Sequence, residues 1–180
     1  MDIGVHYREL FSYCPEELQR LLLAASEDIW EKNDFRQKTF AVHRNTKSIV
    51  YVWSNFSDAD YQSVVTHIPE GDPDPVHREV WKVAKKMKHY YGEKSTITKL
   101  MLAKLNKQSE IAEHFDQGNL TRIHRCHLPV ITNKDCLFLI DKKEYHFQPS
   151  FAFEFNNQKL HGVRNNSGED RVHLICDILD

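Results

Sequence analysis

Three residues of the sequence have side chains that are suited to hold one metal ion. His114 and Asp116 are separated by a single residue, and His161 lies further along the chain. Because residues i and i+2 of an extended chain point to the same side, the first two side chains can reach the same ion. Two imidazoles and one carboxylate cover one face of an octahedral metal and leave positions open, as in non-haem iron(II) oxygenases. A structural zinc site would instead need a closed tetrahedral set.

An arginine close to the C-terminus adds a second chemical feature. Arg171 follows His161 and opens the apolar segment 172–179. A guanidinium in a buried strand needs an acidic partner, and a carboxylate of a ligand supplies one through a bidentate contact. The sequence therefore predicts an anion-binding arginine next to the metal site.

Residues 1–94 are expected to form helices and a hairpin beside this site. Apolar residues recur every three or four positions near the N-terminus, which predicts an amphipathic helix. Segments 39–43 and 48–53 are predicted as two strands that are joined by a turn. Segment 54–75 is predicted as a long loop and a candidate lid, and segment 76–91 as a second amphipathic helix.

Residues 95–180 change in character to strands that are broken by turns. Three phenylalanines alternate with other residues in segment 151–155, so one aromatic face of that strand must be covered. No parallel β-α-β rhythm occurs, which favours a mostly β fold with flanking helices, a double-stranded β-helix or cupin-like jelly roll. We expect one domain over residues 1–180. The predicted strands are 96–105, 121–132, 137–140, 151–155 and 171–179, with turns at 141–144 and 165–168.

Composition and charge narrow the classes of function. The 180 residues are 41% hydrophobic, which is enough for one core. The formal net charge is −2, so nucleic acid is not an expected partner. No apolar run reaches the roughly 20 residues of a membrane span, and the first residues are too polar for a signal peptide. The four cysteines are far apart, which is typical of reduced thiols in a cytoplasmic protein.

Four motifs of the C-terminal half occur in an informative order. They are Ile-Ala-Glu-His-Phe-Asp (111–116), His-Arg-Cys-His-Leu-Pro-Val-Ile-Thr-Asn (124–133), Phe-Asn-Asn-Gln-Lys-Leu-His-Gly-Val-Arg-Asn (155–165) and Asp-Arg-Val-His-Leu-Ile-Cys-Asp-Ile (170–178). In this order and spacing, the chain resembles the aspartyl/asparaginyl β-hydroxylase family. Animal members look as though they have glycine where this chain has Asp116. The sequence is therefore more similar to the small bacterial members that hydroxylate free amino acids such as proline.

The resemblance implies an iron(II)- and 2-oxoglutarate-dependent dioxygenase. Such an enzyme hydroxylates an unactivated C–H bond with O₂ and releases succinate and CO₂. The implied substrate is an amino acid, an amino-acid-like small molecule or a short peptide. By position, the resemblance implies His114, Asp116 and His161 as ligands of Fe(II), Arg171 as the partner of the distal carboxylate of 2-oxoglutarate, and Arg125 and His127 as residues of the cosubstrate pocket nearer the metal.

Two other functions are compatible with parts of the sequence. Pro149, His161 and Asn165 also fit the second motif of cupins, so a cupin-like metal- or small-molecule-binding module without oxygenase activity is the alternative. The first cupin motif is missing, which favours the hydroxylase. A protein or nucleic-acid hydroxylase that uses the lysine-bearing face of segment 76–91 is a third hypothesis, although a solvated helix face explains these lysines more simply.

Other histidines and arginines receive simpler interpretations. His124 lies three residues before His127 and should face the opposite side of its strand, so we interpret it as structural. His173 shares the pocket-facing side of its strand with the motif arginine. Arg122 and Arg164 compete with the two motif arginines for anion contacts, and their position in the motifs decides against them.

Overall fold

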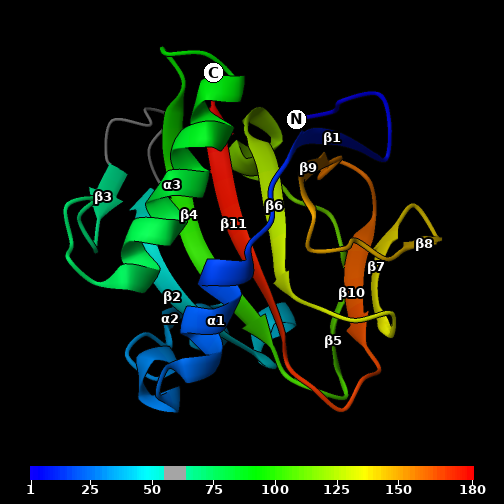
Figure 1. Cartoon of the computed structure of the whole chain (residues 1–180). Helices are drawn as coiled ribbons and strands as arrows, with labels where there is room; N and C mark the ends of the chain where they lie inside the picture. Colours follow the sequence, from blue (N-terminus) through cyan, green and yellow to red (C-terminus); the bar gives the residue numbers. More distant parts are fainter. Residues whose placement is uncertain (55–63) are drawn as a thin grey trace.

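The structure, a computed structural model, describes residues 1–54 and 64–180 and consists mainly of two antiparallel sheets (Figure 1). Over these residues the larger sheet has seven strands in the order β1-β9-β6-β11-β4-β2-β3, and the smaller has four in the order β5-β10-β7-β8. The strands are β1 (Tyr7–Ser12), β2 (Thr46–Ser54), β3 (Val64–Thr66), β4 (Thr96–Leu105), β5 (Ser109–His114), β6 (His124–Ile131), β7 (Cys136–Ile140), β8 (Lys143–Tyr145), β9 (Phe151–Phe155), β10 (His161–Asn165) and β11 (Arg171–Leu179).

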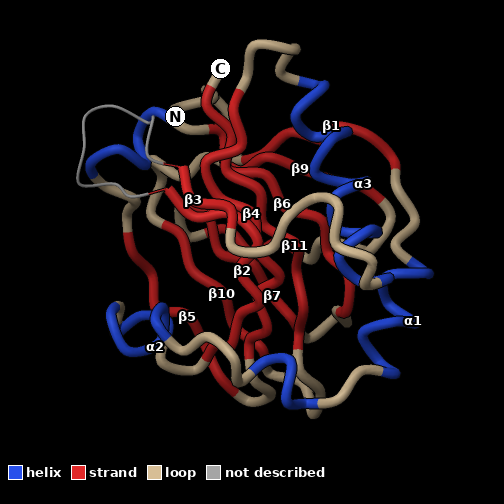
Figure 2. The backbone as a smooth tube through the Cα atoms, turned by 90° about the vertical axis from the view of Figure 1, so that its left-hand side faces the viewer, coloured by secondary structure: helices blue, strands red, loops and turns tan. Residues whose placement is uncertain are grey.

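Of the three helices in the described residues, two cover the outer face of the larger sheet. In Figure 2, α1 and α3 lie together along one side of the strands. Their apolar side chains pack against the outward-facing residues of β4, β6 and β11 in the main hydrophobic core. The helices are α1 (Glu16–Ala24), α2 (Phe35–Thr39) and α3 (Pro75–Tyr90), with short 3₁₀ turns η1 (Glu27–Trp30), η2 (Ala41–His43) and η3 (Gly118–Arg122).

The space between the two sheets divides into an aromatic core and a cavity that contains several charged side chains. Phe153 and Phe155 of β9 pack there against Phe138 and Phe147, which cover the aromatic face predicted for this strand. Toward β2 and β4, Met101 and other inward residues form a smaller apolar cluster beside the cavity. The alternation of side chains along β4 and β11 thus separates a packed outer face from an inner face that carries functional groups.

The predicted fold class is confirmed, and the long strands were predicted well. Segments 96–105, 151–155 and 171–179 coincide with β4, β9 and β11, and the predicted second helix is α3. β6 begins three residues later than predicted because a 3₁₀ turn, η3, precedes it. The predicted turn at 141–144 joins β7 to β8, and Asp141 and Lys142 adopt the left-handed backbone conformation that tight hairpin turns need.

The predicted strand at 39–43 is wrong. Helix α2 ends at Thr39, and η2 occupies Ala41–His43. Arg36, Gln37 and Lys38 are good helix formers, and β2 finds its partners in β3 and β4 rather than in a local hairpin. Within the predicted loop 54–75, residues 55–63 lie outside the described residues, so the lid stays a prediction.

The sequence analysis also missed five strands. The short strands β5, β8 and β10 were not predicted, and neither was β1, which pairs with β9 at the edge of the larger sheet. β3 lies within segment 54–75, which was predicted as a loop. β1, β2 and β3 of the first 94 residues therefore join strands of the later part in one sheet. No helix within residues 1–54 and 64–180 is long and apolar enough to cross a membrane. All four cysteines are free thiols, as expected.

Candidate metal centre

The two histidines of the predicted metal site face each other across two strands. In the antiparallel pairing of β5 with β10, His161 lies opposite His114, and their ring centroids are 4.4 Å apart. Asp116 follows β5 directly. One ligand atom from each of these three residues lies within 4.8 Å of the others, close enough for a single ion to contact all three.

Hydrogen bonds to the backbone fix the tautomers of both imidazoles. Nδ1 of His114 lies 2.8 Å from the carbonyl oxygen of Ala112, and Nδ1 of His161 lies 2.9 Å from that of Lys159. A carbonyl oxygen only accepts, so each Nδ1 donates its proton and each Nε2 keeps a lone pair for a metal. Burial lowers the pKa of His161 to about 4, which leaves this imidazole neutral at pH 7. The donor set therefore fits an iron(II) ion.

A glycine next to His161 allows the two strands to approach closely. The register between β5 and β10 shifts between His161 and Val163, with Gly162 at the shift. A Cβ atom on Gly162 would lie 2.8 Å from the carbonyl oxygen of Ile111 and 3.1 Å from the backbone nitrogen of Glu113. Both contacts are with backbone, so a side chain here would push apart the strands that hold the histidines.

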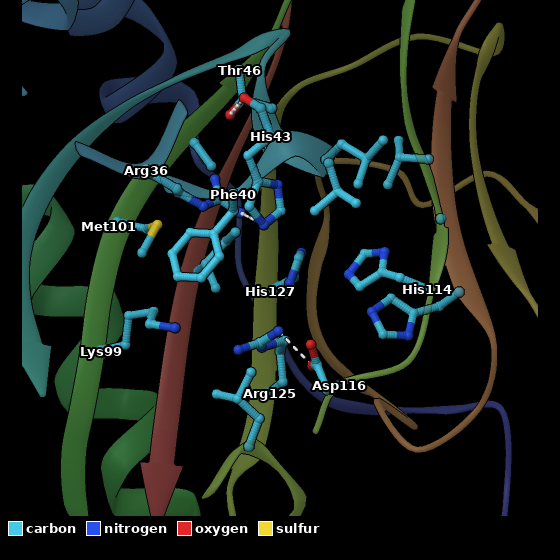
Figure 3. Close-up of a pocket in the computed structure, with 18 of the residues that line it drawn as sticks. Arg36, Phe40, His43, Thr46, Lys99, Met101, His114, Asp116, Arg125 and His127 are labelled. Atoms are coloured by element: carbon cyan, nitrogen blue, oxygen red, sulfur yellow. Dashed lines mark hydrogen bonds and ion pairs between the residues drawn. The ribbon is translucent and has the colours of Figure 1, made fainter. Parts of the chain in front are cut away.

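An arginine holds the carboxylate of the site. Oδ2 of Asp116 lies 2.5 Å from Nη1 of Arg125 (Figure 3). The backbone amide of Asp116 donates to the carbonyl of Asn157. Arg125 also donates to both oxygens of the buried Asp177, at 2.9 and 2.8 Å. Although burial opposes it, the charges of the two carboxylates raise the pKa of Arg125, so this guanidinium stays charged and orients Asp116.

All six predicted site residues line one cavity between the sheets. Its volume is about 550 Å³, which lies in the range of sites that bind small molecules. Arg125 and His127 enter it from β6 and Arg171 from β11, on the larger sheet, whereas the two histidines of the triad come from the smaller sheet. The cavity residues among these predictions are His114, Asp116, Arg125, His127, His161 and Arg171.

Arg171 is a buried cation without an acidic partner among the described residues. Its Nη2 lies 2.7 Å from Nδ1 of His173, and its guanidinium carbon lies 5.8 Å from the ring centroid of Phe138. Burial lowers the pKa of Arg171 to about 9, even though the nearby Cys136 opposes the shift. An anionic ligand in the cavity would compensate this charge.

His127 offers a polar atom to the same cavity. Its Nδ1 lies 3.3 Å from Nδ1 of His173, whereas its buried Nε2 has no hydrogen-bond partner in the part of the chain that the structure describes. Burial, and then the charge of Arg171, lower the pKa of His127 well below its usual value, so the ring is neutral. A buried ring nitrogen that lacks a partner inside a cavity indicates a position for a ligand.

The interpretation of the remaining histidines and arginines agrees with the structure. His124 faces away from the cavity, donates from Nδ1 to Oε1 of Glu154 at 2.7 Å, and stacks on Tyr91, which follows α3. His173 lies on the inner side with Arg171, as expected. Arg164 pairs with Glu144 at the surface, and neither it nor Arg122 is among the described residues that line the cavity.

The sequence analysis missed four basic residues of the cavity, namely Arg36, His43, Lys99 and Lys104. Lys99 interrupts an apolar strand as Arg171 does, so the same signal could have identified it. Arg36 and His43 carried no such signal, because the segment that contains them was assigned partly to a strand. Their place in the cavity depends on how α2 and η2 fold back over the sheet.

Comparisons with known proteins agree with this geometry. A sequence model of the family described as Aspartyl/Asparaginyl beta-hydroxylase matches residues 14–180. A search of curated proteins finds no match.

Three similar solved structures are oxygenases. The viral collagen prolyl hydroxylase of Paramecium bursaria Chlorella virus-1, solved with 2-oxoglutarate, has a TM-score of 0.59 at 12% identity, over 97% of this chain and 96% of that chain. A Pseudomonas putida prolyl-4-hydroxylase has a TM-score of 0.56 at 12% identity, over 99% and 95%. A 2OG-Fe(II) oxygenase family protein of Burkholderia pseudomallei has a TM-score of 0.54 at 10% identity, over 74% of this chain and 66% of that chain.

The structural similarities, at such low identity, show the fold, which is that of the double-stranded β-helix oxygenases. The family match covers all the motifs from which the family was predicted, and it extends over most of the chain. The predicted family is thus confirmed: the chain belongs to the aspartyl/asparaginyl β-hydroxylase family and is an iron(II)- and 2-oxoglutarate-dependent oxygenase.

Proposed function

We propose that this enzyme hydroxylates an amino acid, an amino-acid-like small molecule or a short peptide. One oxygen atom of O₂ enters a C–H bond of the substrate, and the other enters succinate as 2-oxoglutarate loses CO₂. The observation that carries the proposal is a single cavity in which a His-Asp-His triad and a buried arginine without an acidic partner among the described residues face the same space. A small dicarboxylic cosubstrate beside a metal explains both features.

Each predicted residue has a role in this proposal that its contacts support. His114, Asp116 and His161 hold Fe(II), since their free nitrogens and carboxylate converge. Arg171 binds the distal carboxylate of 2-oxoglutarate and His127 contacts the cosubstrate through its unpartnered Nε2. When bound, the metal and the cosubstrate supply the activation of O₂.

Arg125 receives a more specific role than the sequence suggested. Its guanidinium lines the cavity, yet two carboxylates already occupy its donors. We assign it to the positioning of Asp116, so that the carboxylate stays aimed at the metal position. The second partner, Asp177, holds the guanidinium in place from the far side.

The size and composition of the cavity support a small substrate. A volume of about 550 Å³ accommodates the cosubstrate together with a small molecule or the end of a peptide. A cupin-like module without oxygenase activity would not need a buried arginine opposite the metal ligands. The hydroxylase therefore explains more of the site than this alternative does.

A spectroscopic titration tests the proposal without knowledge of the substrate. Under anaerobic conditions, Fe(II) and 2-oxoglutarate should together produce a visible metal-to-ligand charge-transfer band. The variants Asp116→Ala and His161→Ala should weaken or abolish this band, whereas His67→Ala, at an exposed position outside the cavity, should retain it. Wild-type protein that contains iron but shows no band would contradict the proposal. A screen of the twenty amino acids for stimulated formation of succinate would then identify the substrate.

A further inference from the structure

A buried histidine lies behind two residues of the cosubstrate site. His173 follows Arg171 by two positions on β11, so the two side chains lie on the same face of the strand. Nη2 of Arg171 lies 2.7 Å from Nδ1 of His173, and Nδ1 of His127 lies 3.3 Å from the same nitrogen. His173 is 2% exposed. One buried ring nitrogen therefore joins the two residues to which the cosubstrate is assigned.

The hydrogen-bond partners of His173 fix its tautomer. A guanidinium only donates hydrogen bonds, so Nδ1 of His173 accepts from Arg171, and the ring proton of His173 is on Nε2. Burial, and then the charge of Arg171, lower the pKa of His173 well below its usual value, which keeps the ring neutral. Because Nδ1 of His173 has a lone pair and no proton, the proton between the two imidazoles belongs to Nδ1 of His127.

The tautomer of His127 determines what this residue can bind. With its proton on Nδ1, the neutral ring has a lone pair on Nε2, and this buried atom has no hydrogen-bond partner among the described residues. Figure 3 shows the ring projecting from β6 toward the side of the cavity that holds His114. Nε2 needs a donor, whereas a carboxylate oxygen only accepts. A water molecule that donates one proton to Nε2 and the other to a carboxylate of 2-oxoglutarate satisfies both groups.

His173 itself lies outside the reach of a ligand. It is not among the described residues that line the large cavity. It borders a second, separate cavity of about 10 Å³, which Arg171 also lines. A space of this size holds about one water molecule at most. His173 can therefore affect the cosubstrate only through Arg171 and His127.

Two contacts hold the guanidinium of Arg171 in one orientation. Its Nη2 donates to His173, and its central carbon lies 5.8 Å from the ring centroid of Phe138. Within the described part of the chain, no other side chain accepts a hydrogen bond from Arg171. An arginine side chain has many rotamers, so an orientation that is fixed before binding lowers the entropic cost of binding a carboxylate.

We propose that His173 is a positioning residue of the cosubstrate site. It orients Arg171 toward the distal carboxylate of 2-oxoglutarate, and it fixes Nε2 of His127 as a hydrogen-bond acceptor that meets the cosubstrate through a bridging water. This inference rests on the proposed function and adds to it a residue that no cosubstrate atom touches. Both contacts with the cosubstrate then depend on the lone pair of one buried nitrogen.

Nuclear magnetic resonance tests the tautomers directly. Protein that contains ¹⁵N-labelled histidine is loaded with Zn(II), a diamagnetic substitute for iron, and measured at pH 7 with and without 2-oxoglutarate. His127 should carry its proton on Nδ1 and His173 on Nε2 in both samples. In His173→Phe, the Nδ1 proton of His127 loses its acceptor. The tautomer of His127 with the proton on Nε2 should then become populated when 2-oxoglutarate is bound, because that proton can be donated to the carboxylate.

The affinity for 2-oxoglutarate gives an independent readout. With Mn(II) bound, His173→Phe should weaken the binding of 2-oxoglutarate at least about tenfold in calorimetry, because a phenyl ring makes neither hydrogen bond. His173→Asn places an amide oxygen close to the position of Nδ1, so its affinity should stay within about threefold of the wild type. His89→Phe makes the first replacement at an exposed position of α3 and should bind 2-oxoglutarate as the wild type does.

The outcomes separate this inference from the proposed function. A wild type that does not bind 2-oxoglutarate in the presence of Mn(II) would refute the proposed function. If the wild type binds it, that function stands, and any of three results would overturn the role of His173. They are a His127 proton on Nε2 or on both nitrogens in the wild type, an undiminished affinity in His173→Phe, and a loss of affinity in His173→Asn as large as in His173→Phe. The first result comes from the wild type alone, so it decides even if the phenylalanine variant does not fold.

Discussion

Replacement of Arg171 by methionine should change stability and cosubstrate affinity in opposite directions. Arg171 is 4% exposed, and the described residues place no carboxylate against it. Burial lowers its pKa from 12.5 to about 9. A decrease of this size corresponds to about 5 kcal/mol of unfavourable free energy for the charged form. The ligand-free protein thus keeps a charge in its interior at a cost that a neutral side chain would avoid.

The magnitude follows from what the substitution removes. Methionine has a similar length, but it cannot make the hydrogen bond of Arg171 to His173 or the contact of the guanidinium with the Phe138 ring. Replacement of a buried charged group by an apolar one of similar size is often neutral or stabilising by about 1–4 kcal/mol. We therefore expect the free energy of unfolding of ligand-free Arg171→Met to equal or exceed that of the wild type. Affinity for 2-oxoglutarate should fall by about 3 kcal/mol or more, at least about 100-fold.

Two measurements on the same samples test the expected change in stability and the expected change in cosubstrate affinity. Urea unfolding gives the stability with and without Mn(II) and 2-oxoglutarate, and calorimetry gives the dissociation constant of 2-oxoglutarate. Arg164→Met is a suitable control, because Arg164 lies on β10 but pairs with Glu144 at the surface. The control should change neither quantity appreciably.

The reverse pattern would refute the ligand-binding role of Arg171. If ligand-free Arg171→Met lost more than about 2 kcal/mol of stability and still bound 2-oxoglutarate normally, Arg171 would be a structural group. The anion would then have to bind elsewhere in the cavity. Weaker binding together with lower stability would show that the substitution disturbs the packing of β11 as well as the ligand contact.

Three further predictions concern other parts of the fold. Gly162→Ala should destabilise the protein by about 1–3 kcal/mol and weaken Mn(II) binding, because the new Cβ meets backbone of β5; unchanged metal affinity would show that the strands tolerate it. Removal of metal by a chelator should lower the melting temperature of metal-loaded wild type but not of Asp116→Ala, and equal shifts would contradict the metal site. For His124, burial lowers the pKa, but its hydrogen bonds and attraction to Glu154 and Asp180 raise it overall, whereas that of Glu154 is lowered. The stabilisation by His124 is present below its unfolded pKa of 6.5 and lost at higher pH, whereas that by Glu154 is present above 4.5 and lost at lower pH. His124→Gln should therefore lower the free energy of unfolding by about 1–3 kcal/mol between these two pH values and by less at pH 8. Urea unfolding within that range and at pH 8 would show the difference.

The long strands could be predicted because their hydrophobic patterns match the burial of their residues. β4 and β11 are buried on both faces and read as apolar runs, and β9 shows strict alternation of phenylalanine with other residues. The six site residues could be named because their types and motif order suffice, without knowledge of the exact strand that carries each one. The structure places all six in one cavity.

Several strands could not be predicted for a physical reason that involves the site itself. β10 has the sequence His-Gly-Val-Arg-Asn, and most of its positions serve the metal site or the turns rather than an apolar face. β1 is an edge strand that is only partly buried, so its hydrophobic pattern is weak. α2 has five residues, and it is held by contacts with β2 and η2 that a local pattern does not contain. The position of Arg36 in the cavity therefore could not be predicted from the sequence.

The pair β4 and β11 shows how one sheet combines packing with chemistry. Its outward residues, such as Leu102 and Leu174, pack beneath the helices in the main core. Its inward residues place Lys99 and Asp177 at one end and Arg171 at the other, with smaller apolar residues between them. Because neighbouring side chains of a strand point to opposite faces, the helix-covered face can supply the stability that buried charges on the inner face remove. The cavity can therefore hold buried cations such as Lys99 and Arg171 without the loss of a well-packed core.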